Sequence, residues 1–155
     1  MKMSEEMKLM LDENIVYLAT STKEGKPNVV PIGMAHAIND EQLLVVDVMF
    51  KKTRKNLEDN PQVAISFTDV KRWQSYQLKG TATIHTDGEI FDEVQNVMRE
   101  KSERRKAHTD GIEDLVIKEK VRRMGEWRKK LRPKAAVVVT VEEIYSHMPK
   151  LDKNE

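Results

Sequence analysis

The amino-acid sequence predicts a mainly β protein of the α+β class, a six-stranded antiparallel barrel with peripheral helices. Six segments have the length, the alternation or the β-branched content of strands, and most of them are joined by short turns. No repeated strand–helix–strand order runs through the chain, which argues against a parallel sheet. We expect one domain over residues 1–155, with a helical insertion at about 87–132.

The first third predicts a short helix and then a β-hairpin. Ser4 is an N-cap residue before a helix whose apolar side chains share one face, Met7, Met10 and Leu11. Residues 15–20 predict a strand, and a turn at 23–26 leads to a second strand over 28–38. Proline cannot donate to a ladder, so Pro31 places an edge or a bulge inside the second strand. Backbone groups interrupted there are free for a ligand.

The third strand predicts an anion site where it leads into a short helix. An apolar run over 43–46 continues to Lys51, Lys52 and Thr53, and a helix is expected over 54–59. Backbone N–H groups at a helix start lack partners, so they converge there with two lysines and a hydroxyl. These groups suit a phosphate. A solvated basic turn is the alternative interpretation of the same residues.

Two further strands are expected over 62–68 and 73–85, with a loop between them. Gly80 marks a bulge or a bend, the feature by which a closing barrel turns a corner. Trp73 and Tyr76 bracket the start of the longer strand. They suit either stacking on a flat ring or closing one end of the barrel.

Two helices and a last strand complete the pattern. A capping-box spacing from Thr86 to Glu89 predicts the start of the first helix, which breaks at 108–111. The second helix carries apolar residues at helical spacing, which are Ile117, Val121, Met124, Trp127 and Leu131. Trp127 on this stripe is expected in the core rather than over a ligand. Residues 134–141 form the most apolar strand and are expected at the centre of the sheet.

Composition excludes several classes of function. The chain has no cysteine, so disulfides, thiolate catalysis and Cys-ligated metals are excluded. Its acidic N-terminus is unlike a signal peptide and no apolar run reaches the length of a membrane span, so we expect a cytoplasmic protein. No nucleotide-binding, hydrolase or zinc-protease motif occurs, and the four histidines fall on different elements. We therefore expect no metal site, and no catalytic residue is identified.

Charge is distributed unevenly along the chain. The net charge is only +1, but residues 99–134 hold 14 Lys and Arg against 7 Asp and Glu, whereas the remainder holds 13 against 19. Basic residues in this segment alternate with acids and only one aromatic accompanies them. This pattern favours a solvated or intersubunit helix over a nucleic-acid contact.

Five sequence blocks occur in an order known from one family. They are EGKPNVVP at 24–31, KKTRKNLEDNP at 51–61, LKGTA at 78–82, HTDGEIF at 85–91 and PKAAVVVTV at 133–141. Together they make residues 5–147 resemble the FMN-binding split β-barrel proteins related to pyridoxamine 5′-phosphate oxidase. The likeness is greatest to the small FMN-binding proteins of that family.

The resemblance implies a homodimer with non-covalently bound FMN at the interface between two barrels. The isoalloxazine edge would lie along Val30, Pro31, Ile32 and Gly33. The phosphate would meet Lys51, Lys52 and Thr53, with Asp47 nearby on the same strand and Gln77 lining the site from another strand. The fold implied is a split barrel, and the function is that of a flavin-dependent oxidoreductase or an electron carrier.

Two departures from the family pattern limit what carries over. The segment from Arg99 to Arg132 is longer than in the smallest members, and the residues that recognise pyridoxamine phosphate have no counterparts, so vitamin B6 oxidation is not expected. Two alternatives stay open. In the first, the chain is a split barrel that binds a deazaflavin or haem instead of FMN. In the second, it is a non-enzymatic binding protein. For haem, His36 is the one histidine expected near the site.

Overall fold

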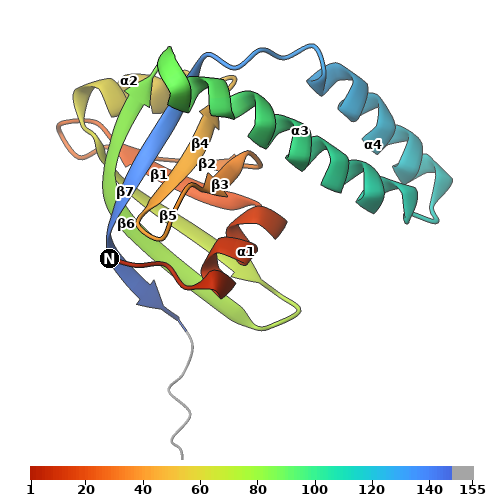
Figure 1. Cartoon of the computed structure of the whole chain (residues 1–155), viewed down its shortest axis with the longest axis horizontal. Helices are drawn as coiled ribbons and strands as arrows, with labels where there is room; N and C mark the ends of the chain where they lie inside the picture. The colour runs from red at the N-terminus through yellow and green to blue at the C-terminus, as the bar shows by residue number, and fades with distance from the viewer. Residues whose placement is uncertain (148–155) are drawn as a thin grey trace, which may run out of the picture.

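The computed structural model describes residues 1–147 as a strongly curled antiparallel sheet with four helices (Figure 1). In chain order the elements are α1 (Glu5–Glu13), β1 (Val16–Ser21), β2 (Pro27–Ile32), β3 (Ala35–Ala37), β4 (Gln42–Asp47), α2 (Lys52–Asp59), β5 (Gln62–Asp69), β6 (Gln74–His85), α3 (Gly88–Asp110), α4 (Leu115–Arg128) and β7 (Ala135–Ser146). The antiparallel split-barrel class predicted from the sequence is confirmed.

The sheet has seven strands rather than the six expected, in the order β2-β1-β5-β6-β7-β4-β3. The expected strand over 28–38 is two strands, because the chain leaves the sheet at Gly33 and Met34. β2 and β3 are therefore consecutive in sequence but lie at opposite edges of the curled sheet. Their link crosses the seam where the barrel is open, and Pro31 lies on an edge strand as its missing N–H requires.

Burial divides the core into two parts. The larger part fills the inside of the curled sheet with side chains such as Leu18, Ile65 and Phe67, and Met10 and Leu11 of α1 pack into it. In the smaller part α3 packs against the other side of β4 and β7, with these residues buried together: Leu44, Val46, Val94, Val97, Ala136 and Val138. β7 lies between β6 and β4, so the apolar run of 134–141 is central as expected.

Local sequence signals account for most element boundaries. The Ser4 hydroxyl accepts from the Met7 N–H and caps α1 as expected. The register of β6 against β7 shifts between Lys79 and Gly80, which confirms the expected bulge, and a Cβ at Gly80 would overlap the carbonyl of Thr140. The capping box expected from Thr86 to Glu89 is wrong. Asp87 is the N-cap of α3, and no side chain caps that end.

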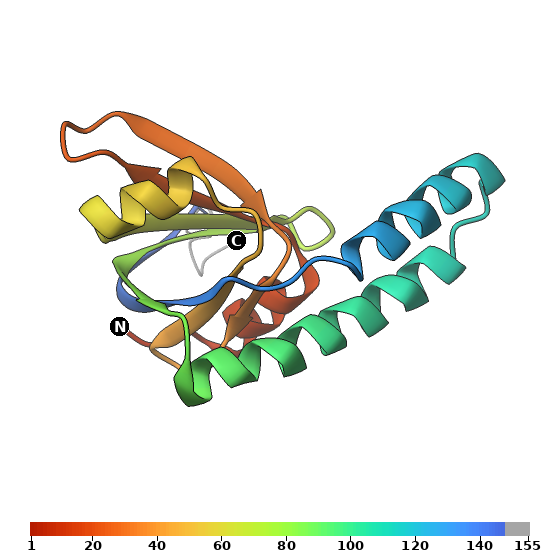
Figure 2. The same ribbon diagram turned by 90° about the horizontal axis from the view of Figure 1, so that it is seen from above.

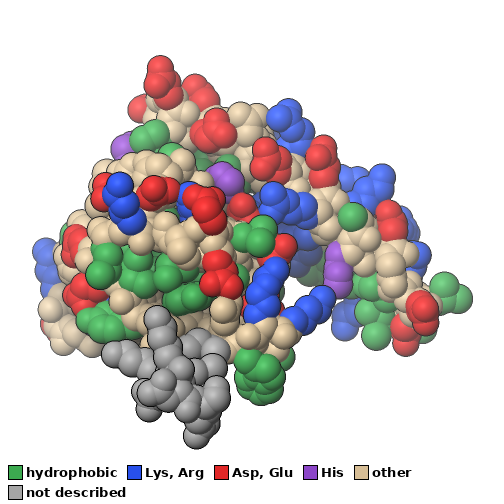
Figure 3. Space-filling view, turned by 60° about the horizontal axis from the view of Figure 1, so that its bottom comes forward, with side chains coloured by type: hydrophobic (Ala, Val, Ile, Leu, Met, Phe, Trp, Pro, Cys, Tyr) green, Lys and Arg blue, Asp and Glu red, His purple; other side chains and the backbone are tan. Residues whose placement is uncertain are grey.

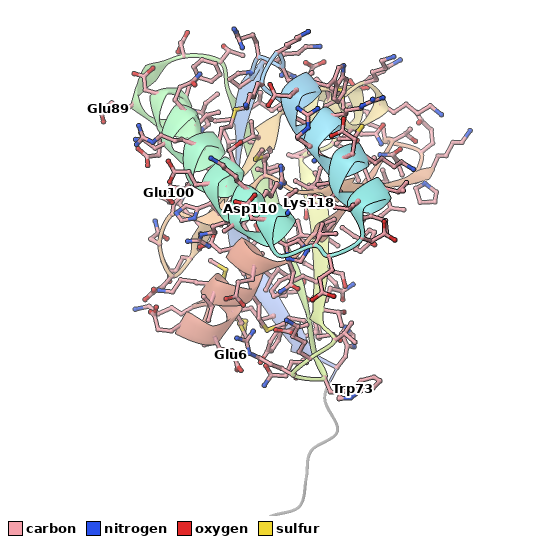
Figure 4. The ribbon with its side chains drawn as sticks, turned by 90° about the vertical axis from the view of Figure 1, so that its right-hand side faces the viewer. Glu6, Trp73, Glu89, Glu100, Asp110 and Lys118 are labelled. Atoms are coloured by element: carbon pink, nitrogen blue, oxygen red, sulfur yellow. The ribbon has the colours of Figure 1, made fainter. Side chains whose placement is uncertain are left out.

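α3 and α4 form a helical hairpin that projects beyond the barrel, as both ribbon views show (Figures 1 and 2). Its two helices lie side by side, and Lys118 of α4 donates to the Asp110 carbonyl of α3 at 3.0 Å (Figure 4). Tyr76 is buried against Phe67, whereas Trp73 is 79% exposed at the β5–β6 turn. Among residues 1–147 no helix is both long and apolar enough to cross a membrane.

Candidate functional site

A groove of about 520 Å³ lies at the seam between β2 and the loop that connects β4 to α2. Two stretches that are distant in sequence form its walls, the end of β2 with its link to β3, and the residues from β4 to the first turn of α2. The lining residues are Asn28, Val30, Pro31, Ile32, Gly33, Met34, Val46, Val48, Met49, Phe50, Lys51, Lys52 and Thr53. The groove is thus mainly apolar and has a basic end.

Seven of the nine residues predicted for the cofactor site line this one groove. Val30, Pro31, Ile32 and Gly33 line it from β2 and the link to β3. Lys51, Lys52 and Thr53 line it from the start of α2. The curl of the sheet brings the two sets together, because β2 and β4 lie at opposite sides of its open seam.

The basic end of the groove is the N-terminus of α2. The helix begins at Lys52, two residues before its expected start, and its N-cap Lys51 has φ −122° and ψ −85°. No side chain caps this end, and neither lysine forms an ion pair with another residue in 1–147. Uncapped N–H groups, the helix dipole and two lysine charges therefore all favour an anion at this point.

A buried hydrogen-bond network fixes this end of α2 to the sheet. The Asn28 amide donates to the Thr53 hydroxyl at 3.1 Å and to the Thr20 hydroxyl at 3.3 Å. Asn56 donates to the same Thr20 hydroxyl at 3.0 Å. Thr20, Thr53 and Asn56 are all buried, so the network holds the first turn of α2 against β1 and β2.

Asp47 does not line the groove but supports it. Its buried carboxylate accepts from the Phe50 N–H at 3.0 Å and pairs with Arg54 at 3.0 Å. Arg54 also pairs with Glu58 at 2.8 Å. The two hydrogen bonds of Asp47 therefore fix both ends of the loop that carries Lys51.

Gln77 lies outside the groove of its own chain, on the outer side of the sheet. The register places it in one row across five strands with Tyr17, Pro31, Ser66 and Tyr145. None of these side chains is buried. Gln77 therefore does not line the groove, but it lies in the same row of the sheet as Pro31, which does.

The groove also contains residues that sequence reasoning missed. Asn28 lies in the sequence block at 24–31, but nothing in that block indicates that its side chain lines a groove. Met34, Val46, Val48, Met49 and Phe50 complete the apolar wall. In the sequence these residues resemble ordinary core and loop residues. No local pattern therefore predicts that they line a groove.

Arg105 of α3 contacts the groove lining at Gly33. Its guanidinium donates to the Gly33 carbonyl oxygen at 2.7 Å, and a Cβ on Gly33 would collide with it. Burial lowers the pKa of Arg105, and the nearby charge of Arg128 lowers it further. From the sequence, Arg105 was expected on a solvated or intersubunit helix. In the structure it binds the backbone at Gly33.

α3 is anchored to the body one turn earlier through Lys101. This buried lysine donates to the carbonyl oxygens of Leu11 and Asp12 at 3.2 and 2.7 Å, and it pairs with the Asp12 carboxylate at 3.1 Å. Burial lowers the pKa of Lys101, although Asp12 opposes this shift. The His36 ring contacts the same carboxylate at 2.8 Å, outside the groove lining. No cluster of three or more possible metal-binding side chains occurs in residues 1–147.

Comparison with known proteins decides the family. The profile of the pyridoxamine 5′-phosphate oxidase family matches residues 3–148. The chain belongs to this family. It is also 32% identical over 147 residues to the uncharacterized protein MJ0282 of Methanocaldococcus jannaschii, which covers 94% of this chain and 80% of that protein. The family resemblance inferred from the five sequence blocks is confirmed.

Solved structures share the fold of this family member. HupZ of Group A Streptococcus has a TM-score of 0.69 at 23% identity, with 94% of each chain covered. An FMN-binding protein of Syntrophomonas wolfei has a TM-score of 0.66 at 13% identity, covering 92% of this chain and 84% of that one. An F420 reductase and the haem storage protein HutZ of Vibrio cholerae have TM-scores of 0.59 and 0.54, at 17% and 18% identity. The fold therefore accommodates several cofactors.

Proposed function

We propose that this family member is a homodimer that binds FMN non-covalently and acts as a flavin-dependent oxidoreductase or electron carrier. The observation that carries the proposal is the convergence of the edge of β2 with the uncapped, doubly basic N-terminus of α2 on one groove. The first offers backbone polar groups and apolar side chains to a flat ring. The second offers positive charge to a phosphate.

The residues present fit FMN in chemical type. Lys51, Lys52 and the N–H groups of α2 would hold the phosphate, and the backbone of 30–33 would meet the edge of the isoalloxazine. Bound FMN supplies the redox chemistry, and the protein supplies orientation and electrostatics. Apolar side chains such as Val46 and Phe50 would exclude water from one side of the ring.

The outer side of the sheet supports the homodimer. α3 covers β4 and β7 on that side, but the rows formed by β2, β1, β5 and β6 remain exposed, including Tyr17 at 53% and Val29 at 62%. Small side chains, Ala19 and Ala64, continue the row of Val29 onto β1 and β5. Such an exposed and partly apolar face suits a second barrel, and Gln77 on it would then approach the partner's groove.

The test is an absorbance spectrum of the purified protein and a fluorescence titration with FMN, riboflavin and FAD. We expect a yellow protein, or a colourless one that binds added FMN and shows the band of oxidised flavin. FMN should bind more tightly than riboflavin by at least about tenfold, because riboflavin lacks the phosphate and forfeits a charge-assisted hydrogen bond. Colourless protein that takes up no FMN contradicts the proposal.

The same groove suits a deazaflavin that carries a phosphate, which is the second candidate cofactor. A parallel titration with F420 and haem separates the candidates by relative affinity. Haem is disfavoured because His36, the histidine expected near the site, is bound to Asp12 and does not line the groove. Saturable, tighter binding of F420 than of FMN would replace FMN in the proposal and keep the site.

A further inference from the structure

One side of α4 exposes apolar side chains that no other part of residues 1–147 covers. Ile117 is 52% exposed, Met124 43% and Trp127 46%, and none of the fourteen residues of α4 is buried. Val121 and Gly125, which are half-buried, lie toward the other side of the stripe. The apolar stripe predicted from the sequence therefore exists, but the expectation that Trp127 lies in the core is wrong for a single chain.

The hairpin is nevertheless fixed to the body through α3. α3 is fixed by the buried Lys101 to the end of α1 and by Arg105 to Gly33. Its N-terminal half is packed through Val94 and Val97. A helix pair anchored this firmly at one end, and projecting from the barrel with an uncovered apolar side, is built to meet another surface (Figures 1 and 2).

The distribution of charge along the chain indicates which surface the hairpin would meet. Residues 99–134 carry a net positive charge, and the remainder of the chain a net negative one, so the hairpin is complementary to the body of an identical molecule. Basic side chains lie on the side of the molecule where the hairpin projects, and exposed hydrophobic ones lie at its end (Figure 3). Two hairpins would repel each other, which favours contact with the body over contact with the partner's hairpin.

Two other occupants fit less well. A basic amphipathic helix suits an anionic membrane, but part of the positive charge of α4 is already paired, with Glu119 bound to Arg122 and Arg123 and Glu126 bound to Lys129. The same pairs weaken a contact with nucleic acid. A second copy of this chain offers both an acidic body and an exposed apolar sheet face.

We propose that the exposed side of α4, namely Ile117, Met124 and Trp127, docks on the body of a second copy and is the main determinant of dimerisation. The proposal rests on the homodimer of the proposed function and names the element that forms it. Because α3 contacts Gly33 in the groove wall, the interface formed by the hairpin adjoins the cofactor groove. Docking would therefore shield bound FMN from solvent.

The first test measures the oligomeric state of flavin-free protein by analytical ultracentrifugation. Met124→Ala and Trp127→Ala should each raise the dimer Kd by at least about tenfold, since a buried aromatic anchor dominates an interface. Arg122→Ala on the other side of the same helix, and Val70→Ser at the β5–β6 turn, should leave the Kd within about threefold. Circular dichroism checks that all four variants are folded.

The second test uses the absence of cysteine in the chain. Met124→Cys is labelled with a benzophenone maleimide, mixed with tagged wild-type protein and irradiated, and the cross-linked peptides are mapped. Cross-links from position 124 to residues outside 99–134 of the tagged chain support the proposal. Cross-links confined to the labelled chain or to the tagged chain's hairpin overturn it, as does binding of anionic vesicles by a protein that stays monomeric.

The two proposals fail in distinguishable ways. Variants of α4 that leave the dimer intact overturn the docking proposal, whereas FMN titration of the same proteins still tests the cofactor. Loss of the dimer should make the fluorescence of bound FMN at least about threefold more accessible to iodide quenching. If the wild-type protein is monomeric at all concentrations, both the homodimer and the docking proposal are wrong. FMN binding is then still tested by the titration.

Discussion

Asn28 on β2 and Thr53 in the first turn of α2 are joined by a hydrogen bond of 3.1 Å, from the amide of the first to the hydroxyl of the second. Both residues line the groove, and the same amide reaches Thr20 on β1. This contact links the edge strand of the sheet to the helix start that we propose for phosphate binding. It sets the separation of the two walls of the groove.

Asn28→Ala should loosen this link. We expect a loss of about 1–2 kcal/mol in the free energy of unfolding, because a buried hydroxyl loses its partner, and a fall of about tenfold in FMN affinity. Urea denaturation and fluorescence titration measure the two effects. Asn60→Ala is the matched control, since Asn60 bonds Ser21 at 3.0 Å at the far end of α2. Equal losses of affinity in the two variants would contradict a special role of Asn28.

Lys52→Glu should weaken FMN binding by at least about tenfold and leave the fold intact. Lys52 is exposed and unpaired among the described residues, so the fold loses nothing, while the phosphate would lose a charge-assisted hydrogen bond and meet a negative charge. Titration measures the affinity. Lys55→Glu, on the same helix but outside the groove, should change it little. If riboflavin loses as much affinity as FMN in Lys52→Glu, the phosphate is bound elsewhere.

Residues whose role depends on their immediate neighbours were predictable from the sequence. Pro31 indicates an edge strand because it lacks an N–H, and the apolar run that leads into Lys51 and Lys52 indicates a strand followed by a helix start. The anion site at these lysines stays a prediction. Gly80 likewise indicates the bulge, since any Cβ there would meet the backbone of β7. These signals located both walls of the groove.

Residues whose role depends on the closure of the sheet were not predictable. Val46 reads as an ordinary strand residue, and only the seam between β2 and β4 makes it part of a groove wall. Arg105 contacts Gly33 across 72 residues of sequence, with nothing local to mark it. The seventh strand was missed because the bend at Gly33 and Met34 carries no strong turn signal. Trp127 was misassigned because periodicity reveals an apolar face but not what covers it.

Arg105→Met should lower the free energy of unfolding by about 1–2 kcal/mol, because the half-buried Gly33 carbonyl loses a charged donor. Gly33→Ala should cost less than about 1 kcal/mol, since the new methyl displaces only the flexible end of Arg105. The double variant should be less destabilised than the sum, because both changes break one contact. Denaturation of all four proteins measures the coupling. Arg104→Met, exposed beside it, is the control, and full additivity would refute the contact.

His36 should make stability depend on pH. The hydrogen bond that the His36 ring donates to the Asp12 carboxylate raises the pKa of His36. Burial and the charge of Lys101 oppose this shift, and the charge of Glu100 adds to it. Asp12 is itself desolvated, but its bonds to His36 and Lys101 outweigh burial and lower its pKa. In the native state His36 therefore keeps its proton to a higher pH than its unfolded value of about 6.5.

The sign follows from proton linkage. Above about pH 6.5 the native state binds more protons than the unfolded state, so this part of the stability is complete below that pH and is lost as the pH rises through the native pKa of His36. We expect the urea midpoint of the wild type to fall between pH 6 and pH 8 by more than that of His36→Gln, which keeps a hydrogen-bonding side chain beside Asp12. His85→Gln is the control, as His85 lies at the end of β6, away from Asp12. Parallel pH profiles for the wild type and His36→Gln would show that the contact with Asp12 does not shift the proton equilibrium.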